Sequence, residues 1–64
     1  MKKTYDDCYT KAFETNDGTF VAISRDAGNR YWNVFVRKPD EKKGKVIATR
    51  CTFEKAMSIA EQFD

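Results

Sequence analysis

The sequence predicts a small α+β domain: a three-stranded antiparallel sheet with a C-terminal helix and an N-terminal helix packed on one face. Three β-rich segments follow one another through short turns, and apolar residues at helical spacing occur near both ends of the chain. The chain has 64 residues, and its 41% apolar fraction is sufficient for a folded core. We therefore expect a single domain over residues 1–64.

Residues 4–15 allow two interpretations. Five apolar residues lie at the spacing of one helix face, and Thr4 is placed to cap that helix: Tyr5, Cys8, Tyr9, Ala12 and Phe13. The alternative is a strand over residues 9–15 followed by a hairpin turn at Asp17 and Gly18, which gives a four-stranded sheet. A strand would divide the apolar residues between two faces, so we expect the helix.

β-branched and aromatic residues predict strands over residues 19–24, 31–37 and 45–50. Gly28 and Asn29 form the turn between the first two strands. Pro39 ends the second strand, and residues 38–44 form a charged hairpin loop. Such short connections predict antiparallel neighbours.

The last predicted element is a helix that begins after Thr52, its N-cap, with Glu54 in the first turn. Its apolar stripe is Phe53, Ala56, Met57, Ala60 and Phe63. This stripe must cover one face of the sheet.

The composition argues against an enzyme. The chain has no histidine, its glycines are isolated, and its adjacent acidic residues would diverge rather than converge on a substrate. Cys8 and Cys51 alone cannot complete a four-ligand zinc site. We therefore expect no catalytic residues, no metal and no cofactor. We expect both thiols to be reduced and buried, and we expect a cytoplasmic protein without a membrane segment.

The central strand indicates where a partner binds. Trp32, Val34 and Val36 alternate toward the core, so the residues between them point to the other face. The predicted binding residues on that face are Tyr31, Asn33, Phe35 and Arg37, with Phe20 and Arg50 able to join them from flanking strands. Aromatic residues with arginine are typical of interaction hot spots and of base-stacking platforms. The competing interpretation buries this face under the N-terminal segment or in a homodimer.

A basic run accompanies this face. Seven positive residues lie between positions 30 and 50, and Lys42, Lys43 and Lys45 in or beside the hairpin loop are the candidates for phosphate contact. The simpler explanation is a charged loop that keeps an edge hairpin soluble.

Three strands followed by a helix over about residues 19–63 resemble the DNA-binding domains at the N-termini of some phage-type integrases. Those domains lay a sheet in the major groove, and the resemblance implies base-reading positions at Asn33, Arg37 and Arg50. With an N-terminal helix the order resembles a double-stranded-RNA-binding domain, although the last helix has only Lys55 near its start. Residues 34–36 are similar to a cold-shock strand.

We therefore expect a non-enzymatic binding protein that docks on a larger protein and blocks it, of the phage-encoded or mobile-element inhibitor type. The alternative is a nucleic-acid-binding domain that uses the open sheet face and the basic hairpin. Its net charge of +2 steers nucleic acid only weakly. We expect no membrane partner, and either a monomer or a homodimer.

Overall fold

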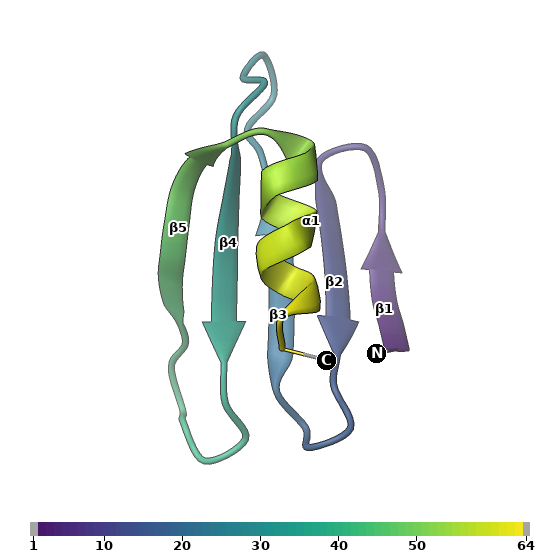
Figure 1. Cartoon of the computed structure of the whole chain (residues 1–64), viewed down its shortest axis with the longest axis vertical. Helices are drawn as coiled ribbons and strands as arrows, with labels where there is room; N and C mark the ends of the chain where they lie inside the picture. Colours follow the sequence, from purple (N-terminus) through teal and green to yellow (C-terminus); the bar gives the residue numbers. More distant parts are fainter. Residues whose placement is uncertain (1, 64) are drawn as a thin grey trace.

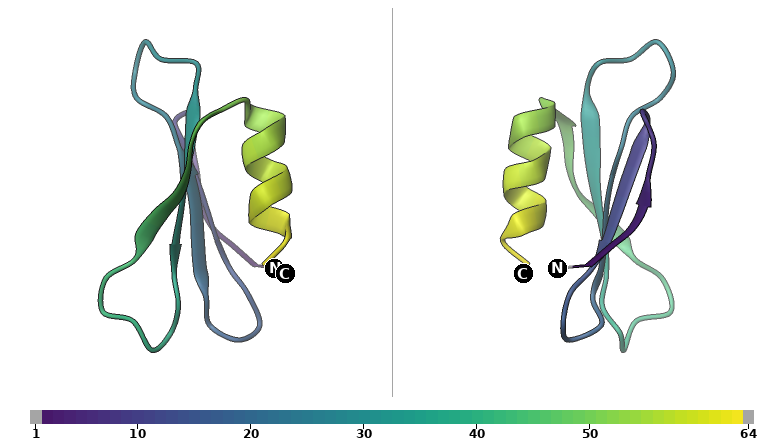
Figure 2. Two further views of the ribbon diagram at one scale, coloured as in Figure 1. Left: turned by 60° about the vertical axis from the view of Figure 1, so that its left-hand side comes forward. Right: turned by 90° about the vertical axis from the view of Figure 1, so that its right-hand side faces the viewer.

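The computed structural model describes residues 2–63, which form a five-stranded antiparallel sheet with one helix on one side (Figure 1). The strands lie in chain order across the sheet: β1 (Lys2–Asp6), β2 (Thr10–Glu14), β3 (Phe20–Ser24), β4 (Trp32–Arg37) and β5 (Lys45–Cys51). The helix α1 (Phe53–Glu61) then returns over the sheet, and side views show two layers (Figure 2).

The three predicted strands and the C-terminal helix are confirmed, with ends that shift by one or two residues. The predicted N-terminal helix is wrong. Residues 2–14 form β1 and β2 instead, so the sheet has five strands rather than three or four.

Two aspartates explain why the N-terminal segment is extended. Asp7 accepts hydrogen bonds at Oδ1 from the backbone N–H groups of Tyr9 (2.8 Å) and Thr10 (2.7 Å), which closes the β1–β2 turn. Asp17 accepts one from the N–H of Thr19 (3.1 Å) in the β2–β3 turn, where Gly18 has a φ of 90°. Such side-chain bonds to the backbone compete with helix formation. The hairpin turn at Asp17 and Gly18, considered as the alternative, is therefore present.

The core lies between α1 and the sheet. The prediction that Trp32, Val34 and Val36 face the core is confirmed, since all three are buried in one cluster. Ala56 and Ala60 of α1 have no exposed surface, so their small side chains let the helix backbone approach the sheet closely.

The start of α1 follows the predicted capping. The Thr52 hydroxyl accepts a hydrogen bond from the Lys55 N–H at 3.2 Å, and Glu54 lies in the first turn. No helix of the described residues is both long enough and apolar enough to cross a membrane.

The cysteines differ from expectation in one respect. Cys51 is buried as predicted, but Cys8 is exposed because it lies in the β1–β2 turn rather than on a packed helix face. Both thiols are free.

Both edge strands are irregular. The β1–β2 register shifts between Lys3 and Tyr5, and the β4–β5 register shifts on either side of Val34. At the second of these edges Arg50 has a φ of 57°, which is rare for a residue with a side chain.

Candidate functional site

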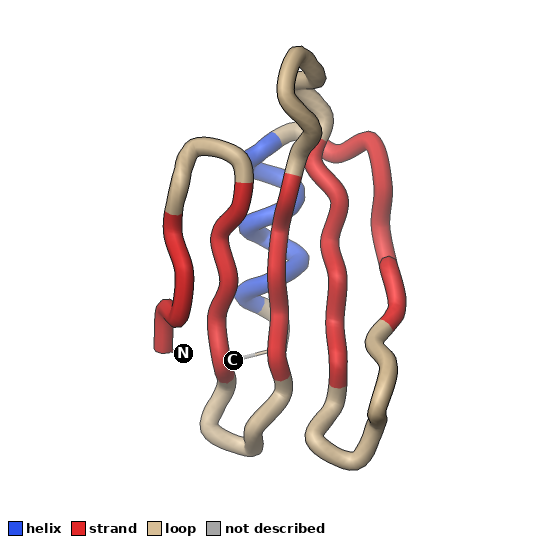
Figure 3. Tube along the Cα trace, turned by 180° about the vertical axis from the view of Figure 1, so that it is seen from behind, coloured by secondary structure: helices blue, strands red, loops and turns tan. Residues whose placement is uncertain are grey.

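The side of the sheet opposite α1 is uncovered among the described residues, and we call it the open face (Figure 3). Paired residues on neighbouring antiparallel strands point to the same side of the sheet. The register therefore forms an apolar row across all five strands: Tyr5, Ala12, Ala22, Phe35 and Val46. Beside it runs a mixed row across four strands: Lys2, Glu14, Phe20 and Arg37.

The N-terminal segment does not bury this face, because it belongs to the sheet as β1 and β2. Val46 and Tyr5 are the most exposed members of the apolar row, at 55% and 54%. Their exposure leaves apolar surface at both margins of the open face.

The two phenylalanines of the open face are half-buried and ordered by their neighbours. The rings of Phe20 and Phe35 meet edge to face, with their centroids 6.2 Å apart. The Arg37 guanidinium lies 5.6 Å from the centre of the Phe20 ring. Because these side chains are already packed against one another, less rotamer freedom remains to be lost when a partner binds.

Gly44 determines where the Phe35 ring lies. A Cβ atom added at Gly44 would come within 2.2 Å of Cζ of Phe35 and 2.6 Å of the Val36 carbonyl oxygen. The ring therefore occupies the space that a side chain at position 44 would need. The β4–β5 loop supports the centre of the open face in this way.

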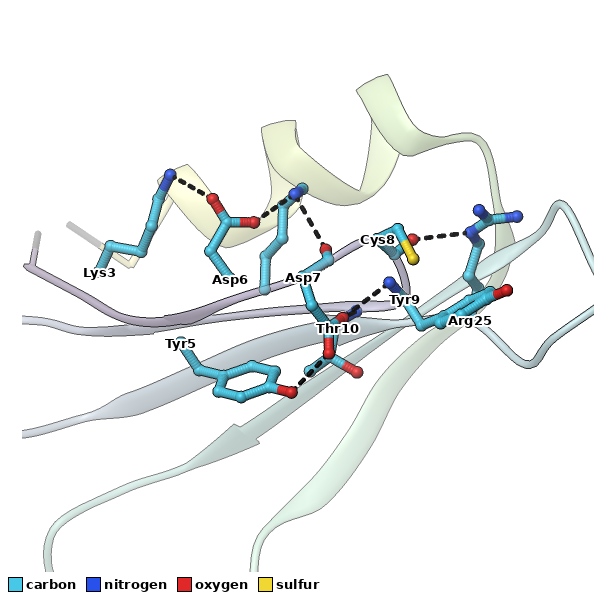
Figure 4. A network of polar contacts seen from close by, with 9 residues as sticks. Lys3, Tyr5, Asp6, Asp7, Cys8, Tyr9, Thr10 and Arg25 are labelled. Carbon is cyan, nitrogen blue, oxygen red and sulfur yellow. Dashed lines mark hydrogen bonds and ion pairs between the residues drawn. The ribbon is translucent and has the colours of Figure 1, made fainter.

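The carboxylate of Asp7 lies in the turn that follows β1 and is held there by hydrogen bonds (Figure 4). The Tyr5 hydroxyl donates a hydrogen bond to Oδ2 of Asp7 at 2.5 Å. This bond is the main cause that lowers the pKa of Asp7, and the same bond raises the pKa of Tyr5. The carboxylate is thus held in its charged form beside the turn.

Three of the predicted binding residues share the open face. Asn33, Phe35 and Arg37 pair with Ser24, Ala22 and Phe20 of β3, which places them on one side. Their role in binding remains a prediction.

The other predicted binding residues are not gathered there. Tyr31 precedes β4 and lines a pocket at the start of α1. Lys42 and Lys43 are exposed in the β4–β5 loop, and Lys45 pairs with Val36 on the α1 side of the sheet. Arg50 is exposed in the irregular part of β5. The structure therefore divides the basic run between two sides of the sheet.

The pocket has a volume of about 360 Å³ and is lined by Arg30, Tyr31, Trp32, Thr52 and Phe53. Trp32 and Phe53 meet edge to face, with centroids 5.1 Å apart, and the Arg30 guanidinium lies 5.4 Å from the Tyr31 ring centre. The sequence pattern does not predict this pocket, because it places Trp32 and Phe53 in the core and Tyr31 on the open face. It forms where the β3–β4 loop meets the helix, a contact that strand and helix patterns do not reveal.

Several members of the open face are not predicted by the sequence pattern. The pattern places Tyr5 and Ala12 on a helix, and it does not specify the strand register that brings Ala22 and Val46 to the open face. Lys11, Ala12, Phe13 and Glu14 do not alternate between apolar and polar residues, so the Asp17–Gly18 turn was the available signal for a strand.

Among residues 2–63 no three His, Cys, Asp or Glu side chains are grouped to hold a metal ion. No family model, curated protein or solved structure matches this chain.

Proposed function

We propose that this protein is a non-enzymatic, cytoplasmic binding protein that docks on a larger protein through the open face and blocks it, in the manner of phage-encoded or mobile-element inhibitors. The observation that carries the proposal is the apolar row, which crosses all five strands with no helix over it. Exposed apolar surface, here at Val46 and Tyr5 at the two ends of a row whose Ala12 is buried, is typical of protein interaction sites.

The residues of the open face suit distinct parts of such an interface. Phe35 and Phe20 provide aromatic anchors near the centre, where buried contacts dominate binding energy. Asn33 offers both a hydrogen-bond donor and an acceptor, and Arg37 adds a charge that can pair with a carboxylate. Val46 extends the apolar contact to the edge of the sheet.

Site-specific photocrosslinking in the cells that make the protein tests this proposal. A benzophenone side chain at Val46 should crosslink to a larger protein, because it projects from the open face. The matched control places the same group at Lys55, which is exposed on α1. A larger partner crosslinked from position 55 but not from position 46 would assign docking to the helix side and contradict the proposal.

Nucleic-acid binding is the second candidate, and cations stacked on aromatic rings favour it. Arg37 lies over Phe20, and Arg30 lies over Tyr31. Such pairs can stack on unpaired bases while the guanidinium contacts phosphate. Fluorescence anisotropy with labelled single- and double-stranded oligonucleotides at two salt concentrations separates the candidates. Binding that weakens steeply with salt, and weakens again in a Lys42→Gln/Lys43→Gln variant, would favour nucleic acid.

A further inference from the structure

The mixed row places opposite charges on either side of an aromatic residue. Glu14 on β2 and Arg37 on β4 both pair with Phe20 of β3, so Phe20 separates them within one chain. Both charged residues are exposed. Read across the sheet, the central part of this row is negative, apolar and then positive.

This order is self-complementary under two-fold symmetry. Two copies can oppose their open faces across a two-fold axis that runs parallel to β3. In that arrangement β2 of one copy lies over β4 of the other, and each residue keeps its position along the strand direction. Glu14 then faces Arg37 of the second copy, Arg37 faces Glu14, and Phe20 meets Phe20. The apolar row likewise meets the apolar row. An isologous interface requires a surface that matches itself in this way.

Lys2, at the outer end of the mixed row, does not oppose this arrangement. Its position on β1 faces the β5 side of the second copy, one residue beyond the Val36–Lys45 pair, where the register continued into the loop reaches Gly44. Gly44 has no side chain, and the exposed lysines that precede it, Lys42 and Lys43, lie in the β4–β5 loop rather than in a strand.

We propose that a second copy of this chain occupies the open face, in a two-fold dimer that pairs Glu14 of each copy with Arg37 of the other. Aligned sheets pack about 10 Å apart with their strands within about 30° of one another. The two apolar rows then form a common apolar centre. The dimer needs no target, so the inference goes beyond the proposed function, and a target would compete with the second copy for the same face.

The edges of the sheet are less suited to self-association than its open face. Strand addition requires a regular row of unpaired backbone groups, and bulges at an edge interrupt such a row. The register shifts in both edge pairings, between Lys3 and Tyr5 and on either side of Val34. A second copy is thus matched to the face rather than to an edge strand.

The test measures mass by sedimentation equilibrium over a range of protein concentrations. We expect the wild-type protein to pass from monomer to dimer. Glu14→Arg and Arg37→Glu should each raise the dimer dissociation constant by about tenfold or more, because each reversal creates two like-charge contacts in the dimer. Circular dichroism checks that the variants remain folded, and Glu61→Arg on the exposed side of α1 is the control that should leave the mass unchanged.

Mixing the two variants is the decisive step. Glu14→Arg and Arg37→Glu copies are complementary at both contacts, so an equimolar mixture should form a heterodimer although neither variant dimerises well alone. A wild-type protein that remains monomeric up to millimolar concentration would overturn the proposal. A dimer that is insensitive to both reversals, or a mixture that shows no recovery, would overturn it as well. None of these results depends on crosslinking to a larger partner, so the dimer and the proposed function fail separately.

Discussion

Gly44 is a residue at which a single methyl group would alter the open face. The Phe35 ring and the Val36 carbonyl already fill the space beside its Cα. The requirement for glycine at position 44 is steric, since it comes from the Phe35 ring and the Val36 carbonyl oxygen rather than from a left-handed backbone. It links the β4–β5 loop to the position of an aromatic anchor.

Gly44→Ala should therefore lower the free energy of unfolding by about 1–3 kcal/mol, the usual cost of overpacking. Urea denaturation of the wild-type protein and the variant measures the change. The same substitution in a Phe35→Ala background should cost less, because only the clash with the Val36 carbonyl oxygen at 2.6 Å then remains. Equal costs in both backgrounds would show that Phe35 is not the obstacle.

Three carboxyl groups should make stability depend on pH. Asp6, Asp7 and Asp17 have pKa values below their usual 3.8, chiefly because of side-chain hydrogen bonds from Lys11, from Tyr5 and from Thr15, respectively. A group whose pKa is lower in the folded state stabilises the fold above its usual pKa, and that contribution disappears as the pH falls through the lowered value.

We therefore expect the urea midpoint to fall as the pH drops below about 4. Asp17→Asn should reduce this acid dependence because it removes one of the three groups, while Asp40→Asn in the β4–β5 loop is the matched control. An Asp17→Asn protein with the full wild-type acid dependence would contradict the assignment.

At the scale of elements, β3, β4, β5 and α1 could be predicted because their patterns have one consistent interpretation. The alternation of Trp32, Val34 and Val36 also placed Asn33, Phe35 and Arg37 on the open face correctly. The helix predicted for the N-terminal segment is wrong, because the apolar spacing fits a helix whereas Asp7 and Asp17 favour turns. The remaining open-face residues depend on register, which no local pattern specifies.

The first turn of α1 is stabilised by its N-cap, Thr52. Thr52→Ala should lower the unfolding free energy by about 1 kcal/mol, because the Lys55 N–H loses its acceptor. Thermal unfolding followed by circular dichroism measures the loss. Ser58→Ala, at an exposed position within α1, should change stability little. Similar losses for both variants would argue against a specific capping role for Thr52.

For the whole molecule, one side of the sheet forms the core and the other remains open. The core is small, and a domain of 64 residues has roughly 3–10 kcal/mol of unfolding free energy. Removing one large core side chain should therefore lower the free energy of unfolding by a large part of its total.

Trp32→Ala should cost about 3–5 kcal/mol and leave much of the protein unfolded at room temperature. Far-ultraviolet circular dichroism would show the loss of secondary structure. Tyr31→Ala, one position earlier and outside β4, should remain folded. A cooperative melt of Trp32→Ala near the wild-type temperature would mean that the core tolerates the cavity.

The order of elements along the chain also affects how the protein is made. Each strand pairs with its neighbour in sequence, so hairpins can form in turn as the chain leaves the ribosome. The helix comes after all five strands, and it alone covers the buried face. Until residues 53–61 emerge, the apolar face that α1 later covers is in water together with the open face, and in this interval a chaperone or a neighbouring nascent chain would find the most surface to bind.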